Sequence, residues 1–130
     1  MKIPERLLMI LTINTKQREQ IELGLFDGDK LLCFEFATEK QSEDILPAID
    51  GILSKQKIKI QDLTAILVHQ GPGSYTGVRV GATVANTLAW SLDLPVLPYD
   101  DDNLTQVLEK AQKEHHYLKL ALPKYYAKII

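Results

Sequence analysis

One cysteine among 130 residues leaves little room for stabilisation by disulfides or thiolates. The single thiol, Cys33, excludes an internal disulfide and a zinc cage built from thiolates. The sequence also lacks an excess of either charge, because 15 Lys and Arg residues stand against 17 Asp and Glu residues. A protein that binds nucleic acid through its phosphates needs a basic face, since counterion release supplies most of that affinity. We therefore expect this chain to bind RNA weakly when it is alone.

Long hydrophobic runs are missing as well. The apolar run that begins at Leu7 is shorter than the core of a signal peptide and far shorter than the roughly 20 residues of a membrane span. We therefore expect a cytoplasmic protein without a membrane contact. The composition, with 45% hydrophobic and 25% charged residues, is that of an ordinary globular domain. The length fits one domain, expected at residues 1–122, followed by a C-terminal tail at residues 123–130.

The hydrophobic periodicity predicts an α/β domain with a mixed sheet. An apolar run and two alternating stretches, with the hairpin turn Asp27-Gly28-Asp29-Lys30, predict an antiparallel three-stranded meander. Helical and strand patterns then alternate, which gives the order β-β-β-α-β-α-β-α-β. That order is typical of the ribonuclease-H-like fold, which also builds the actin-like ATPases. The predicted strands are residues 7–13, 21–25, 32–36, 64–69, 94–97 and 117–122, and the predicted helices are residues 42–55, residues 76–92 and a third capped by Asn103.

Side chains that commonly cap a helix precede the first two predicted helices. Thr38 or Ser42 would cap the first helix, whose positive end also suits the acidic residues that follow. Pro47 requires that helix to begin close to Asp44, because proline fits only the first turn. Ser74 would cap the second helix with its hydroxyl group.

A glycine-rich turn, Gln70-Gly71-Pro72-Gly73-Ser74-Tyr75-Thr76-Gly77, joins a buried strand to the second predicted helix. Such an arrangement can bind an anion, since free backbone N–H groups and the helix dipole point at the ligand. The turn matches no standard nucleotide motif, because five residues separate Gly71 from Gly77 and Val78 follows where a P-loop needs lysine. Pro72 likewise breaks the esterase pattern G-x-S-x-G. Two interpretations stay open: an anion site, and a turn whose glycines only permit close packing.

The second predicted helix is apolar around most of its circumference, which is typical of a helix buried on two sides. One side is a strip of small residues that would pack on the domain's own sheet or let another backbone approach closely. The other side could form a subunit interface, with Tyr75 and Trp90 as aromatic anchors. The small strip is Gly77, Gly81, Ala85 and Ala89, and the row of larger residues is Val80, Val84, Leu88 and Leu92.

Two segments, Gln41-Ser42-Glu43-Asp44-Ile45-Leu46-Pro47 and Gly71-Pro72-Gly73-Ser74-Tyr75-Thr76-Gly77-Val78-Arg79-Val80-Gly81, resemble the TsaB (YeaZ) family. The second comes close to a signature of that family, and the resemblance covers roughly residues 7–100. It implies a part in making threonylcarbamoyladenosine, the modified nucleoside next to the anticodon of tRNAs that read ANN codons. In that family the TsaB-type subunit is not the catalyst. It pairs with TsaD, which holds the metal and transfers the threonylcarbamoyl group, and the ATPase TsaE joins the pair.

The resemblance also implies where the partners bind. Pairing with TsaD would use the helices at residues 42–55 and 76–92, and a homodimer would form through the same surface when TsaD is absent. The chain itself would need no cofactor, metal or catalytic residue, and tRNA would bind only through the complex. On this basis the expected partner-binding residues are Ile45, Ile49, Ile52, Tyr75, Arg79, Gly81, Val84, Ala85 and Leu88.

The chain departs from the family pattern in two places. The first strand of the family usually ends in Asp-Thr-Ser, whereas Asn14-Thr15-Lys16 stands here and lacks the carboxylate that could hold metal or water. Relatives usually carry a second, smaller half, whereas only residues 101–130 follow here; because Pro123-Lys124-Tyr125-Tyr126 resembles the tail of many relatives, we expect a naturally shortened form. Both departures argue against the alternative function, a small actin-like ATP-binding protein or ATPase that uses the glycine turn for phosphate.

Other polar groups have a possible chemical role and a simpler explanation. His115 and His116 are adjacent and would point about 100° apart on a helix, so they cannot share a metal. The acidic run at residues 100–102 could bind a divalent cation, but it is also typical of a loop before a helix. Arg79 could pair with an acidic residue of the first helix or hold a carboxylate of a partner. Ser74 lacks an evident His and Asp pair, so we expect a cap and not a nucleophile.

Overall fold

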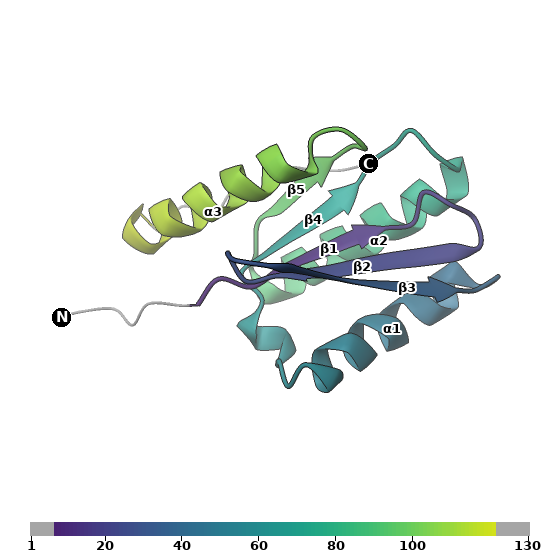
Figure 1. Cartoon of the computed structure of the whole chain (residues 1–130), viewed down its shortest axis with the longest axis horizontal. Coiled ribbons are helices and arrows are strands. Elements are labelled where there is room, and N and C mark those ends of the chain that lie inside the picture. Colours follow the sequence, from purple (N-terminus) through teal and green to yellow (C-terminus); the bar gives the residue numbers. More distant parts are fainter. Residues whose placement is uncertain (1–6, 122–130) are drawn as a thin grey trace.

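A computed structural model describes residues 7–121 of the protein, with side chains described for residues 7–113. These residues form a five-stranded mixed sheet with helices on both faces (Figure 1). No helix within residues 7–121 is long and apolar enough to cross a membrane. In chain order the elements are β1 (Ile10–Asn14), β2 (Gln20–Phe26), β3 (Leu31–Ala37), α1 (Gln41–Lys55), the 3-10 turn η1 (Ile60–Asp62), β4 (Ala65–His69), α2 (Tyr75–Leu92), β5 (Val96–Tyr99) and α3 (Leu104–Ala121).

The strands lie in the order β3-β2-β1-β4-β5. The first three are antiparallel neighbours, with Ile13 opposite Leu23 and Leu23 opposite Phe34, which confirms the predicted meander. β4 and β5 then add in parallel, with Ile66 opposite Leu11 of β1. All five residues of β4 are buried, as a continuous apolar run in a parallel strand predicts. Because β1, β4 and β5 run the same way, their carboxyl ends meet at one edge of the sheet.

Alternation along the strands divides the core into two layers. Leu11 and Ile66 belong to the larger layer, which α1 and α2 cover. Ile10 and Leu67 point to the opposite face, where Leu108 of α3 packs. The sheet therefore has α1 and α2 on one face and α3 on the other.

The structure corrects the sequence-based assignment near both ends of the domain. The predicted last strand, residues 117–122, is wrong, because α3 continues through Ala121. Leu122 and the predicted tail at residues 123–130 lie outside the described residues. A short apolar run does not determine its own period, and this one also fits a helix face. The first strand begins at Ile10 and not at Leu7, whose side chain is 84% exposed.

The start of α1 also differs from the expectation. Lys40 precedes the helix, and no side chain caps it, so neither Thr38 nor Ser42 has that role. Thr38 instead accepts a hydrogen bond from the Lys40 N–H (2.9 Å) and donates one to the carboxylate of Asp44. Because the helix begins at Gln41, Pro47 lies beyond its first turn and removes one N–H from the helical ladder.

The cap predicted for α2 is confirmed. Ser74 Oγ accepts a hydrogen bond from the N–H of Gly77 at 3.2 Å. Asn103 directly precedes α3, as predicted, but its side-chain oxygen accepts the N–H of Asp100 at 2.8 Å and so stabilises the preceding loop.

Candidate protein interface

The glycine-rich turn leaves the carboxyl end of β4 and leads directly into α2. Gly71 has a φ of +122°, a conformation that favours glycine. A Cβ atom added at Gly73 would lie 2.6 Å from Lys16 Cβ, because the turn packs tightly on the β1–β2 loop. The N–H of Ser74 also donates to the carbonyl oxygen of Lys16 at 2.8 Å. This packing favours the interpretation that the glycines permit close contact between two loops.

A polar cluster of Lys16, His69 and Asp101 joins three loops at this edge of the sheet. His69 is 1% exposed, and its Nε2 lies 2.7 Å from Asp101 Oδ1, which also accepts a hydrogen bond from Lys16 Nζ at 2.7 Å. The Gly71 N–H donates to His69 Nδ1 at 3.1 Å, so Nε2 carries the proton and points it at Asp101. The bonds from Lys16 and then His69 hold the pKa of the Asp101 carboxyl below its ordinary value of 3.8. The same contact raises the pKa of Lys16 above 10.5.

The small-residue strip of α2 faces the protein's own sheet. A Cβ atom added at Gly77 would lie 2.2 Å from the carbonyl oxygen of Thr15, and one at Gly81 would lie 2.6 Å from Thr15 Oγ1. That hydroxyl also donates to the Gly77 carbonyl at 2.5 Å. Ala85 and Ala89 are buried in the layer between α2 and the sheet. The strip was expected either to pack on the domain's own sheet or to let another backbone approach closely. In the structure it packs on the sheet.

The expected partner-binding residues divide into a buried and an accessible group. The buried group lies in the core, where the folded chain itself covers the side chains, so these residues are not available to a partner in this conformation. Tyr75 and Arg79 are exposed and Val84 is half-buried, and only these three remain accessible. The buried residues are Ile45, Ile49, Ile52, Gly81, Ala85 and Leu88.

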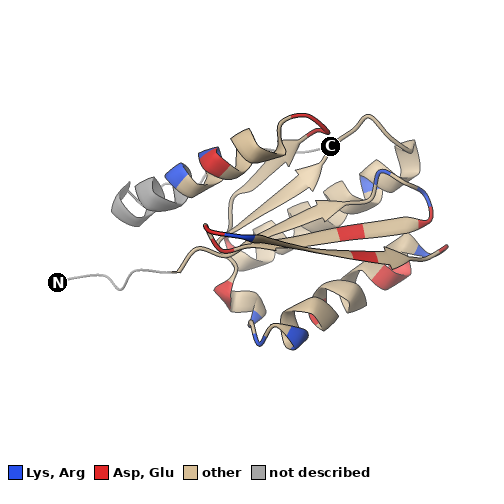
Figure 2. Ribbon diagram, viewed as in Figure 1, with Lys and Arg blue, Asp and Glu red and all other residues tan. Residues whose placement is uncertain are grey.

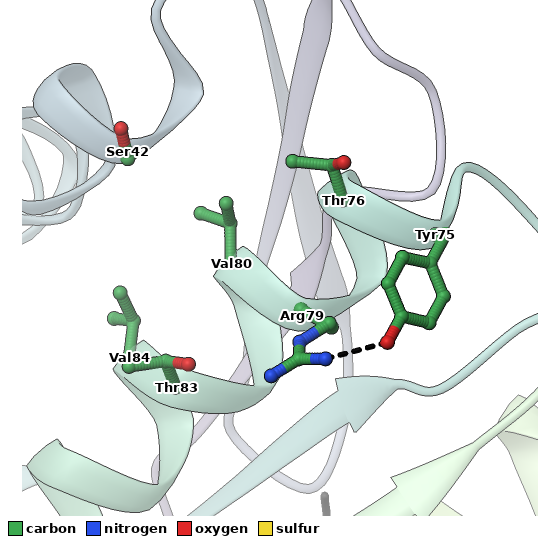
Figure 3. Close-up of a pocket in the computed structure, with 7 residues that line it drawn as sticks. All are labelled: Ser42, Tyr75, Thr76, Arg79, Val80, Thr83 and Val84. Carbon is green, nitrogen blue, oxygen red and sulfur yellow. Dashed lines mark hydrogen bonds between the residues drawn. The ribbon is translucent and has the colours of Figure 1, made fainter.

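The accessible residues belong to a surface along the outer side of α2, which we call the docking surface. Its residues line a hollow of 460 Å³ beside the start of α1 (Figure 3). Thr76, Val80 and Val84 follow one another along α2, with Ser42 of α1 across the gap. Trp90, 84% exposed, lies further along the same helix. The docking surface consists of Ser42, Tyr75, Thr76, Arg79, Val80, Thr83 and Val84.

Tyr75 and Arg79 form an ordered pair at this surface. Arg79 Nη1 donates to Tyr75 Oη at 2.6 Å, and the guanidinium carbon lies 5.3 Å from the centre of the tyrosine ring (Figure 3). Tyr75 is nevertheless 75% exposed. Tyrosine and arginine are enriched among the residues that carry most of the energy of protein interfaces. A pair that is held in place and exposed is therefore suited to bind another protein.

The remaining candidates occupy structural positions. Among the described residues no ion pair joins Arg79 to Glu43 or Asp44. Within the acidic run, Asp100 accepts the N–H of Asp102 at 2.9 Å. No group of His, Cys, Asp and Glu side chains within the described part of the chain could hold a metal ion. The side chains of His115 and His116 lie outside the described residues.

The structural roles of two amides in this region did not follow from the sequence. Gln41, 8% exposed, donates from Nε2 to the carbonyl oxygens of Gln17 and Gln20 at 2.5 and 2.8 Å, which fastens α1 to the β1–β2 loop. Asn14 accepts the N–H of Lys16 at 3.0 Å and donates to Glu22 at 3.1 Å. The partners of Gln41 lie more than 20 positions away, so no local pattern indicates its role.

Comparisons with known proteins identify the family. The family model described as TsaD: tRNA N6-adenosine threonylcarbamoyltransferase matches residues 35–121. The tRNA threonylcarbamoyladenosine biosynthesis protein TsaB of Haemophilus influenzae is 37% identical over 108 residues, which are 83% of this chain and 45% of that protein. The chain belongs to the TsaB (YeaZ) family. TsaB of Bacillus subtilis is 38% identical over 91 residues, which are 68% of this chain and 39% of that protein.

A solved structure supports the fold and the TsaB assignment. YeaZ from Pseudomonas aeruginosa matches with a TM-score of 0.67 and 26% identity, over 81% of this chain and 51% of that one. The chain therefore spans about half the length of the TsaB relatives it matches. A protein named tRNA N6-adenosine threonylcarbamoyltransferase, from Vesicomyosocius okutanii, is also similar, at 33% identity over 66% of this chain. The resemblance seen in the two sequence segments is confirmed, and so is the predicted fold class.

Proposed function

We propose that this chain acts in tRNA threonylcarbamoyladenosine biosynthesis as a non-catalytic scaffold subunit. In this proposal it pairs with TsaD, supports the binding of TsaE and contacts tRNA only through the complex. The names of the TsaB relatives and the match to the TsaD family model support it. The near balance of charges agrees with it, because the chain has a formal net charge of −2.

The exposed Tyr75–Arg79 pair beside the hollow on α2 is the observation that carries the proposal. An apolar partner side chain would fill the hollow beside Val80 and Val84, while the free guanidinium nitrogens of Arg79 would bind a partner carboxylate. A second copy of the chain would occupy the same docking surface when TsaD is absent. Such a surface needs no catalytic group of its own.

Co-purification with TsaD of the same organism tests this proposal. We expect the native chain to form a complex and Arg79→Glu to weaken it at least tenfold, since reversing the charge repels the carboxylate that Arg79 would bind. Lys110→Glu, an equal change of charge at an exposed position of α3, serves as the matched control and should retain the complex. The proposal is contradicted if the native chain does not co-purify with TsaD, or if a folded Arg79→Glu variant binds TsaD as the native chain does.

The ATP-binding alternative has a direct test on the same preparation. Asn14 directs its side chain to Lys16 and Glu22, and the glycine turn packs on Lys16, so neither is arranged as a free phosphate site. Calorimetric titration of the chain with MgATP should therefore give no measurable heat. Micromolar binding would establish the alternative and displace the scaffold proposal.

A further inference from the structure

The outer edge of β3 is unpaired in the part of the chain that the structure describes. β3 is the last strand on one side of the sheet, and no strand within residues 7–121 pairs with its outer side. Its register with β2 is continuous over seven residues, from Leu31 opposite Phe26 to Ala37 opposite Gln20. Such an edge presents a row of backbone donors and acceptors to the surroundings.

The hydrogen bonds that bracket the β2–β3 ladder determine which backbone groups face outward. Asp27 donates to the carbonyl of Lys30 at one end, and Thr38 donates to the carbonyl of Glu19 at the other. In an antiparallel pair, hydrogen-bonded and non-hydrogen-bonded positions alternate. Lys30 and Thr38 are therefore hydrogen-bonded positions, and so is every second residue between them. The backbone groups of Leu32, Phe34 and Phe36 point towards β2. The outward-facing backbone groups are those of Leu31, Cys33, Glu35 and Ala37.

This edge lacks the protection that natural sheets give to their edges. Short strands, proline, lysine and bulges commonly prevent edge-to-edge pairing. The opposite edge strand, β5, has only four residues and contains Pro98. β3 has seven residues with neither proline nor lysine, and its single charged residue is Glu35. In Figure 2 its ribbon is accordingly tan for most of its length.

We propose that two copies of the chain pair along β3, antiparallel, about a two-fold axis beside Phe34. This register places Leu31 opposite Ala37 and Cys33 opposite Glu35 of the second copy, and it uses all four outward-facing positions of each strand. Phe34 then faces its own counterpart, and Leu32 faces Phe36, at the positions where opposing side chains are closest. Leu32 is 37% exposed, and Phe34 and Phe36 are half-buried, so the second copy would cover an apolar row.

Charge and pairing length select this register among the neighbouring ones. A shift of the two-fold axis to Glu35 would set two carboxylates directly opposite each other, which is destabilising. A shift to Cys33 would set Ala37 opposite Asp29, beyond the end of β3, and shorten the ladder. Only the axis at Phe34 pairs the whole strand and places the neutral Cys33 opposite Glu35. The contact differs from the docking surface, because α2 packs against β1, β4 and β5, and β2 separates these strands from β3.

Substitutions at the exposed Cys33 test the proposed β3–β3 register. Dimerisation is measured by sedimentation velocity over a concentration series. The chain carries Arg79→Glu throughout, which is expected to weaken binding at the docking surface and keeps this test separate from TsaD binding. Cys33→Lys places a positive charge opposite Glu35 of the second copy, whereas Cys33→Glu places a negative one there. Because each dimer contains this pair twice, we expect the lysine variant to dimerise about tenfold more tightly than the glutamate variant.

Two controls make the outcome decisive. Gln106→Lys and Gln106→Glu make the same pair of charge changes at an exposed position of α3, and their dimerisation should not differ. Glu35→Cys in the presence of native Cys33 should form an intermolecular disulfide on oxidation, since directly opposed hydrogen-bonded positions have Cα atoms about 5.5 Å apart. The chain with native Cys33 alone should not form this disulfide. In the proposed register the Cys33 residues of the two copies are diagonal neighbours, about 7–8 Å apart. A chain that stays monomeric, or equal dimerisation of the two Cys33 variants, overturns the proposal.

Discussion

At the scale of single residues, one carboxylate connects three loops. Asp101 accepts hydrogen bonds from Lys16 of the β1–β2 loop and from His69 at the end of β4. His69 also accepts the N–H of Gly71, so the cluster reaches the glycine turn that begins α2. The docking surface starts at Tyr75, four residues further on, and its position depends on how firmly that turn is held.

The polar cluster should make stability depend on pH. The folded-state pKa of Asp101 is lowered, so its contribution is present above the ordinary value of 3.8 and is lost as the pH falls through the folded-state value. The pKa of Lys16 is raised, so its contribution is present below 10.5 and is lost as the pH rises through the folded-state value. The difference in the free energy of unfolding between the native chain and Asp101→Asn should therefore be largest at neutral pH. Urea unfolding at several pH values measures this difference. Asp102→Asn controls for the loss of an acidic charge in the same loop.

Close packing makes one glycine of α2 sensitive to a single methyl group. Gly77→Ala would place a Cβ atom 2.2 Å from the Thr15 carbonyl oxygen, so we expect a loss of roughly 3 kcal/mol in the free energy of unfolding. Gly51→Ala, at an exposed position of α1 with no atom within 4 Å of the new Cβ, should instead gain about 1 kcal/mol. Urea unfolding of both variants compares them directly, and equal stability would contradict this account of the α2 contact.

At the scale of elements, the sequence predicts the position of α2 but not which of its faces points to the sheet. Its periodicity and the Ser74 cap predict its position within one or two residues. The direction of its faces does not follow from the pattern, because a strip of small residues and a row of larger ones are both apolar. Contact with Thr15, more than 60 positions away, decides that the strip faces inward. The predicted strand at residues 117–122 failed for a similar reason, since its period depends on what it packs against.

Because the small-residue strip faces the sheet, arginine should have different effects on stability at Ala85 and at Thr83. Ala85 is completely buried, so Ala85→Arg should cost about 4 kcal/mol or more and unfold much of the protein. Thr83 is exposed at the docking surface, so Thr83→Arg should retain the fold. Thermal unfolding by circular dichroism distinguishes the two. Loss of TsaD binding in Ala85→Arg would then report unfolding, and only the same loss in Thr83→Arg would report the interface.

At the scale of the whole molecule, the chain is the sheet and helices that correspond to about half of a TsaB relative. The fold class and the meander could be predicted, because they depend on local alternation and on one hairpin turn. Which of the expected partner-binding residues are exposed could not be predicted, because burial depends on which elements cover one another. Of the nine residues expected at that interface, six belong to the core.

The central position of β1 also has a consequence for the order of folding. One side of β1 pairs with β2, which follows within a few residues, whereas the other side pairs with β4, with Ile10 opposite Ala65. Local contacts form sooner than contacts that close long loops. During synthesis the meander can therefore assemble while the second half of the chain is still being made. Until β4 emerges, the nascent chain has two unpaired strand edges, on β1 and on β3, and within residues 7–121 only the one on β1 is later covered by a further strand.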